Sequence, residues 1–308
     1  MQSSSKFILV GGFGFLGRHL IECLLQNKLF FSVICRSKPS DDWSRFQFFT
    51  EGTLTETEIK ELAVNHDTLI YMASCSVPAT GNVMAEINSN LTTCINIIEK
   101  ITRYNKKIRV IYLSSGGQIY GNSIQKPVAE NHPLKPMSPY GLGKKIIEEC
   151  LLYLHRTSGL RVLILRVGNP VGKWQMGRSQ GLVNVVFECL LKDSVLTIFG
   201  DGQEKRDYLD ANDVASAIIR VAETDLDFGI WNVGSGIATS TLDIISMIEE
   251  QLQRSVKKQF LPRRPIDPQY AVLDCTKIRQ EIGWFAQTPL NVFLPKTIEQ
   301  KKNFNRSI

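Results

Sequence analysis

The chain contains 308 residues, of which 43% are hydrophobic and 21% are charged. These ordinary globular values exclude a disordered tail protein, a collagen-like fibre and a coiled coil. The 36 Lys and Arg residues exceed the 30 Asp and Glu residues, which gives a net charge of +6 with histidine neutral. Because these cations are scattered rather than gathered into a stripe, the charge suits a small anionic ligand and argues against nucleic acid as a partner.

The first half of the chain alternates between short apolar runs and segments with helical spacing. The runs are rich in Val, Ile and Leu on both faces, as is typical of parallel strands covered by helices. This alternation predicts an α/β fold with a Rossmann-like, doubly wound parallel sheet. The expected strands are Phe7–Val10, Phe31–Cys35, Thr68–Ala73, Val110–Leu113 and Val162–Val167. Of the expected helices, one carries Leu16, Leu20, Cys23 and Leu24, one lies near Asn88–Tyr104, and one runs from about Tyr140 to Thr157.

After Gly168 the elements become shorter and are separated by loops that contain Gly and Pro. They include Leu182–Leu191, Ala211–Ala222 and Leu242–Leu252. We therefore predict a dinucleotide-binding domain at 1–168 and a smaller C-terminal α/β substrate-binding domain at 169–308. The apolar run Ile230–Val233 indicates that the chain returns to the first sheet, so that about 205–235 completes the first domain.

A glycine-rich turn joins the first expected strand to the first expected helix. Gly11, Gly14 and Gly17 have the spacing in which the first glycine permits a tight turn, the second admits a pyrophosphate and the third lets the helix pack closely. The N–H groups at the start of this helix, next to Phe15 and Leu16, are expected to face the phosphates. The turn therefore predicts a dinucleotide site.

The end of the second expected strand bears on which dinucleotide is bound. An acidic residue here would bind the ribose of NAD, but the strand ends in Cys35-Arg36-Ser37-Lys38. Arg36, helped by Ser37 or Lys38, suits the 2′-phosphate of NADP, because a guanidinium grips phosphate with two parallel hydrogen bonds. The pattern favours NADP(H). The alternative is NAD(H), with Arg36 stacked on adenine or pointing to solvent.

Tyr140 and Lys144 have the i, i+4 spacing that places two side chains on one face of a helix. An ammonium beside a phenol lowers the phenol's pKa and makes it a general acid/base. Such a group moves a proton on or off a sugar hydroxyl while a hydride moves to or from nicotinamide. Ser114 and Ser115 end the strand before it, and a serine hydroxyl there would hydrogen-bond the same substrate oxygen.

Together these motifs resemble the extended short-chain dehydrogenase/reductases, specifically the nucleotide-sugar epimerase/dehydratase family, from Phe7 to about Leu294. The motifs that carry the resemblance are Gly11–Gly17, Ser114–Gly121, Ser138–Lys144, Arg166–Gly172, Gly200–Gly202, Arg206–Tyr208 and Arg264–Asp267. The resemblance implies a nucleotide-diphosphate sugar as substrate, a homodimer, and a place in the synthesis of surface polysaccharide precursors.

The resemblance also implies residue roles. Tyr140 would be the acid/base, and Lys144 would lower its pKa and hold the nicotinamide ribose. Further cofactor contacts would involve Ala73 and Asn90. The substrate contacts would come from Ser115, Gly116, Asn169, Arg206, Arg264 and Asp267, of which Asn169 and Arg206 would bind the diphosphate.

Two positions depart from the family pattern. Thr53 stands where the family has an Asp that contacts adenine, which weakens any prediction about adenine contacts. Gly116 stands where the family has a catalytic Ser or Thr, four residues before a tyrosine. We expect Ser115, one residue earlier, to take this role, with Ser114 and Gln118 as alternatives.

These departures reduce the number of reactions that the sequence can support. The residues that follow Ser115 include no acid, which argues against a 4,6-dehydratase. The favoured hypothesis is NADPH-dependent reduction of a 4-keto-6-deoxyhexose nucleotide, because Arg36 replaces the carboxylate expected for NAD. A UDP-hexose 4-epimerase with bound NAD is the alternative, since it needs the same Tyr, Lys and Ser. A non-catalytic cofactor-binding protein is a remote third, because such proteins usually lose the Tyr–Lys pair.

The cysteines and the hydropathy bear on location. The seven cysteines show no metal-ligand spacing and lie mostly in apolar segments, which predicts no metal site and a reducing compartment. No apolar run approaches the roughly 18 residues of a membrane span, and the N-terminal residues lack a signal peptide's features. We therefore expect a soluble, cytoplasmic protein with no membrane partner.

Overall fold

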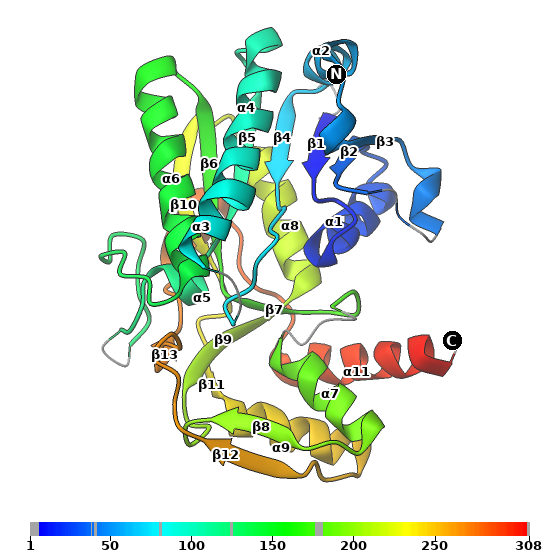
Figure 1. The fold of residues 1–308 in the computed structure, drawn as a ribbon, viewed down its shortest axis with the longest axis vertical. Helices are drawn as coiled ribbons and strands as arrows, with labels where there is room; N and C mark the ends of the chain where they lie inside the picture. Colours follow the sequence, from blue (N-terminus) through cyan, green and yellow to red (C-terminus); the bar gives the residue numbers. More distant parts are fainter. Residues whose placement is uncertain are drawn as a thin grey trace.

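The computed structural model describes residues 6–37, 39, 42–79, 82–123, 126–175 and 181–306. Lys38, named above as a helper of Arg36, lies outside the described residues. Figure 1 shows a sheet with helices on both of its faces in the upper part of the molecule, and a smaller group of helices and strands below it.

The upper part is built on a seven-stranded sheet of order β10-β6-β5-β4-β1-β2-β3. All neighbouring pairs in it are parallel. The strands are β1 (Lys6–Val10), β2 (Phe30–Cys35), β3 (Phe48–Thr50), β4 (Thr68–Tyr71), β5 (Arg109–Ser115), β6 (Arg161–Val167) and β10 (Phe228–Val233). The strand order reverses between β1 and β4, which in such sheets is where ligands bind at the carboxyl ends of the strands. The predicted Rossmann-like fold class is confirmed.

Helices bury both faces of this sheet because successive strand residues point to opposite sides. On one face, Phe7 and Leu9 join a core with α1 (Phe15–Gln26), α8 (Ala211–Ala222) and α10 (Thr276–Ile282). On the other, Ile8 and Val10 join a core with α2 (Glu56–Asn65), α4 (Thr92–Tyr104) and α6 (Pro139–Ser158). The apolar character of these strands on both faces therefore follows from their burial on both sides.

The lower part has a core of its own, formed by residues such as Phe187, Ile245 and Phe293. Its four-stranded sheet contains β7 (Asn169–Val171), β9 (Lys205–Asp210), β11 (Ala238–Ser240) and β13 (Tyr270–Ala271). A parallel pair is formed by β8 (Leu196–Phe199) and β12 (Lys258–Leu261). The helices of this part are α7 (Leu182–Lys192), α9 (Thr241–Leu252) and α11 (Leu290–Arg306). Since β10 pairs with β6, the chain returns to the upper sheet after β9.

The elements differ from the sequence predictions in several places. The fourth strand ends at Tyr71 rather than Ala73. The helix expected near Asn88–Tyr104 is preceded by α3 (Val83–Ala85) and begins with a π-helical turn, Glu86–Leu91, before α4 continues it. Sequence periodicity did not predict α2, although Thr55 and Glu58 form a capping box at its start.

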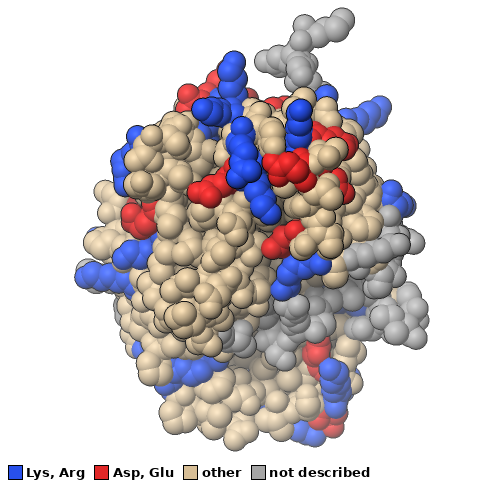
Figure 2. Space-filling model, turned by 45° about the horizontal axis from the view of Figure 1, so that its top comes forward, with Lys and Arg blue, Asp and Glu red and all other residues tan. Residues whose placement is uncertain are grey.

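The charged side chains do not form a single basic stripe on the face drawn in Figure 2. There, Lys and Arg lie among Asp and Glu side chains. Within the described ranges, no helix is long and apolar enough to cross a membrane.

Candidate functional site

A cleft of about 1760 Å³ opens at the carboxyl ends of β1, β2, β4 and β5 and extends into the lower part of the molecule. It is larger than the roughly 300–1,000 Å³ of most small-molecule pockets, which gives room for a dinucleotide and a second ligand. Most predicted site residues line it: Gly11, Gly14, Phe15, Leu16, Gly17, Arg36, Ser37, Ala73, Ser115, Tyr140, Asn169, Arg206, Arg264 and Asp267. Lys144, Asn90 and Gly116 do not line the cleft and are buried behind its wall.

The glycine turn has the geometry that a pyrophosphate needs. Gly11 has φ +83°, and a Cβ on it would lie 2.9 Å from the backbone of Ala73. A Cβ on Gly17 would lie 2.3 Å from the carbonyl oxygen of Gly12, so α1 packs closely on the turn only because residue 17 is a glycine. No side chain caps the start of α1, and its first turn contains no acidic residue. Its first N–H groups therefore remain available to an anion in the cleft.

The charged groups near the end of β2 differ from the sequence expectation, which placed no carboxylate there. The register of β2 and β3 pairs Cys35 with Thr50, so that Arg36 and Glu51 follow neighbouring strand ends. Both residues line the cleft, whereas Thr53 does not. A carboxylate therefore does lie at this end of the site, supplied by the adjacent strand. Sequence analysis missed it because β3, only three residues long, was not predicted.

Tyr140 reaches the cleft from the first turn of α6, and the side chain of Ser115, which also lines the cleft, lies close enough to lower the pKa of its phenol. Of the two alternatives, Ser114 does not line the cleft. Gln118 does, but its carboxamide oxygen accepts a hydrogen bond from Ser138 Oγ at 2.9 Å. The structure therefore brings Ser115, among the three candidates, to the phenol.

Packing leaves no room for a side chain at residue 116. A Cβ there would lie 2.6 Å from Leu273 Cδ1 and 2.9 Å from the carbonyl oxygen of Arg166. A serine at this position would collide with both, and Gly116 itself does not line the cleft. Its predicted role as a substrate contact therefore has no support from this geometry.

The pKa of Tyr140 differs from the sequence expectation. Desolvation raises the pKa of the phenol to about 12, although the side chain of Ser115 lowers it, and Glu86 raises it further. Lys144 Nζ lies 5.6 Å from the centre of the Tyr140 ring and donates to the carbonyl oxygen of Leu113 at 2.9 Å. Burial lowers the pKa of Lys144 to about 8. Desolvation is therefore the main influence on the pKa of the phenol and opposes the expected lowering.

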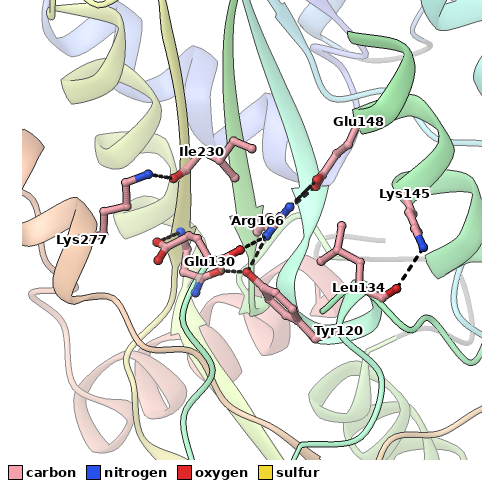
Figure 3. A network of polar contacts seen from close by, with 9 residues as sticks. Tyr120, Glu130, Leu134, Lys145, Glu148, Arg166, Ile230 and Lys277 are labelled. Atoms are coloured by element: carbon pink, nitrogen blue, oxygen red, sulfur yellow. Dashed lines mark hydrogen bonds and ion pairs between the residues drawn. The ribbon is translucent and has the colours of Figure 1, made fainter. Parts of the chain in front are cut away.

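A buried polar network holds α6 against the sheet behind the site (Figure 3). Arg166 on β6 forms an ion pair with Glu148 on α6 at 2.7 Å, and their side chains are 4% and 1% exposed. Arg166 also donates to the Tyr120 hydroxyl at 2.9 Å and to the Glu130 carbonyl at 3.0 Å. The Tyr120 hydroxyl in turn donates to Asn232 on β10. This network fixes the helix that carries Tyr140 and Lys144.

The lower wall of the cleft supplies cations. Arg206 is 9% exposed, and burial lowers the pKa of its guanidinium. Arg264 lies over the Phe199 ring and donates to Asp267 at 2.7 Å. Asn169 contributes a buried Oδ1 that has no hydrogen-bond partner among the described residues. Two guanidiniums and an unsatisfied amide oxygen at one wall suit a ligand with anionic and hydrogen-donating groups.

Asn90 takes a different place from the predicted cofactor contact. Its side chain donates to Ser76 Oγ at 2.9 Å and to Glu86 Oε2 at 2.6 Å, and it accepts from the Cys75 N–H at 2.9 Å. These bonds hold the loop after β4, of which Ser76 lines the cleft. Asn90 therefore supports the wall of the cleft without lining it.

A cation–π contact between an arginine and two tryptophan rings, at the end of the cleft near the glycine turn, was not predicted. The guanidinium of Arg18 lies 5.2 Å from the Trp43 ring centre and 5.1 Å from that of Trp174. Trp43 follows β2, whereas Trp174 follows β7, and the two rings meet edge to face at 5.4 Å. Arg18 and Trp174 also line the cleft. No local motif signals this contact, because it joins segments far apart in the chain.

In the described part of the chain, no three His, Cys, Asp or Glu side chains gather in a way that could hold a metal ion.

Comparisons with known proteins find related sequences and structures over most of the chain. The NAD dependent epimerase/dehydratase family model matches residues 7–234. A putative UDP-glucose 4-epimerase of Methanocaldococcus jannaschii is 26% identical over 97% of this chain and 99% of its own. The dTDP-4-dehydro-6-deoxyglucose reductase of Escherichia coli is 25% identical over 95% and 96%. The Thermotoga maritima UDP-glucose 4-epimerase, solved with UDP-glucose, has a TM-score of 0.85 at 25% identity, over 97% and 99%. The chain belongs to the NAD dependent epimerase/dehydratase family.

Proposed function

We propose that the protein catalyses oxidation and reduction at carbon 4 of a nucleotide-diphosphate sugar, and that it works as a 4-epimerase with bound NAD. One observation carries the proposal: the Tyr140–Ser115 pair lies in one continuous cleft with both the glycine turn and the guanidiniums of Arg206 and Arg264. This arrangement suits a dinucleotide and a sugar diphosphate that meet at the phenol.

Each residue of the site would have a separate role in the reaction. When bound, NAD supplies the chemistry of accepting a hydride from carbon 4 and returning it to the other face, so no outside reductant is consumed. Tyr140 takes the proton of the 4-hydroxyl and gives it back, and Ser115 holds the same oxygen. Because burial raises the pKa of the phenol, a nearby positive charge must offset it, and the Lys144 ammonium is one such charge.

The proposal of NAD rather than NADP rests on Glu51 beside Arg36. A carboxylate accepts hydrogen bonds from ribose hydroxyls but repels a 2′-phosphate. It therefore opposes the NADP(H) preference that Arg36 alone indicates. The family that the chain belongs to is itself described as NAD dependent.

A second candidate is the NADPH-dependent reduction of a 4-keto-6-deoxyhexose nucleotide. Two features favour it: Arg36 lines the cleft, and desolvation raises the pKa of the Tyr140 phenol, which favours its protonated, donating form. The Escherichia coli relative named above is a reductase of this kind.

The test is to identify the dinucleotide that is released when the purified protein is denatured, and then to assay both reactions. The epimerase predicts retained NAD and interconversion of UDP-glucose and UDP-galactose without added cofactor. The reductase predicts an empty protein that turns over dTDP-4-dehydro-6-deoxyglucose with NADPH. Tyr140→Phe should abolish the observed activity while the dinucleotide still binds. Full activity in that variant would exclude the assigned acid/base, and no turnover in either assay would leave a non-catalytic binding protein.

Other parts of the proposal concern the whole molecule. Residues 1–168, with about 205–235, would form the dinucleotide domain, and 169–308 would bind the nucleotide sugar. A cytoplasmic homodimer stays a prediction. Size-exclusion chromatography with light scattering tests the dimer directly.

A further inference from the structure

A buried carboxylate that no sequence motif predicted lies against the helix of the Tyr140–Lys144 pair. Glu86 is 2% exposed and begins the π-helical turn that packs on α6. A Cβ on Gly143, which precedes Lys144, would lie 2.5 Å from Glu86 Oε2 and 3.0 Å from Glu86 Cβ. The absence of a side chain at residue 143 is therefore what allows the carboxylate to approach α6.

The hydrogen bonds of Glu86 leave part of its carboxylate unsatisfied. Oε2 accepts from Asn90 Nδ2 at 2.6 Å. Oε1 is buried and has no hydrogen-bond partner in the described part of the chain. Burying such an oxygen is costly, so its retention requires a compensating interaction.

The Lys144 ammonium on α6 offers Glu86 a favourable electrostatic interaction. Glu86 raises the pKa of both Tyr140 and Lys144. The other titratable groups around this pair are Glu148 on α6, Cys94 on α4 and Tyr112 on β5, and Glu148 is itself paired with Arg166.

We propose that Glu86 is a positioning residue that sets the pH range in which the Tyr140–Lys144 pair works, through a buried negative charge held against Gly143. The proposal rests on the proposed function in one respect, that this pair carries the proton transfer. Glu86 itself does not line the cleft.

The sign of the effect follows from charge alone. A negative charge stabilises the protonated ammonium of Lys144 and disfavours the phenolate of Tyr140. Replacing Glu86 with a neutral isostere therefore lowers both pKa values. Both limbs of the pH profile of kcat/KM should then move toward lower pH, by about one unit for a neighbouring charge. A purely structural role would lower the rate at every pH and would not move the limbs.

The experiment compares Glu86→Gln with the wild type and with two controls. Glu86→Asp keeps the charge and should keep the limbs in place, and Asn90→Ala removes the hydrogen bond but not the charge. Thermal unfolding of each variant identifies any that does not fold. If Glu86→Gln does not fold, Glu86→Ala, which also removes the charge, takes its place.

A second readout does not depend on turnover. In protein with ¹³C-labelled lysine, the NMR titration of Lys144, assigned with Lys144→Met, should move to lower pH in Glu86→Gln. If Lys144 titrates at the same pH in both proteins, the proposal is wrong even where the enzyme is active. If Lys144 shifts but no nucleotide sugar is turned over, the proposed function fails and the charge effect stands.

Discussion

The buried ion pair between Arg166 and Glu148 gives a sharp test of how the site is held. Glu148→Gln leaves the guanidinium buried, with the Tyr120 hydroxyl and the Glu130 carbonyl as its remaining partners. Because the two side chains are 4% and 1% exposed, water cannot replace the lost charge. Removing one partner of such a pair typically costs about 3–5 kcal/mol, and we expect the free energy of unfolding to fall by this amount. Since Glu148 anchors α6, kcat should fall as well.

The assay is urea unfolding followed by circular dichroism, with a double variant and a surface control. The double variant Arg166→Met with Glu148→Leu should lose less than Glu148→Gln, because the Tyr120 hydroxyl keeps its bond to Asn232 and no charge is left unpaired. Glu188→Gln breaks the exposed pair with Lys192 and should change stability by less than about 0.5 kcal/mol. Equal losses in Glu148→Gln and Glu188→Gln would refute the reasoning.

Further predictions concern the cleft. Glu51→Gln should raise the affinity for NADP(H) relative to NAD(H), as measured by fluorescence titration, and an unchanged ratio would remove Glu51 from cofactor selection. Trp174→Leu should speed the release of bound dinucleotide in a competition assay, because the Arg18–Trp43 contact loses its second ring. Activity that requires the Lys144 ammonium should fall as the pH rises through about 8, since burial lowers that pKa from 10.5 and the charged form is lost above it. A pH profile that stays flat to pH 10 would contradict this last prediction.

The parts of the fold that could be predicted are those whose signal is local. Buried parallel strands are apolar on both faces, so Phe7–Val10 and Val162–Val167 agree with β1 and β6 to within one residue. The short strand β3 carries no such signal over three residues. The helix α2 has a weaker amphipathic pattern, and its capping box at Thr55 was the sign that could have revealed it.

The site residues that could be predicted are likewise those with a local signal in the sequence. The glycine turn and the i, i+4 pair of Tyr140 and Lys144 are readable because strand, turn and helix place them within one short segment each. The contacts of Asn90 could not be predicted in this way, because its partners Ser76 and Cys75 come from the loop after β4 and only packing brings them to its polar atoms.

No sequence motif predicted two carboxylates of this arrangement, Glu51 and Glu86. Glu51 reaches the cleft through the pairing of β2 with β3, and Glu86 reaches α6 because Gly143 has no side chain. The residues readable from the sequence serve an epimerase and a reductase equally well, since both need a dinucleotide, a phenol and a hydroxyl. What separates the two reactions is which dinucleotide stays bound and which protonation state the phenol holds. We propose that in this chain both properties depend on charges brought in from neighbouring elements. Under this proposal, a substitution at Glu51 tests which dinucleotide stays bound and one at Glu86 tests the pH range of the pair, whereas substitutions at Tyr140 or Lys144 would abolish either reaction.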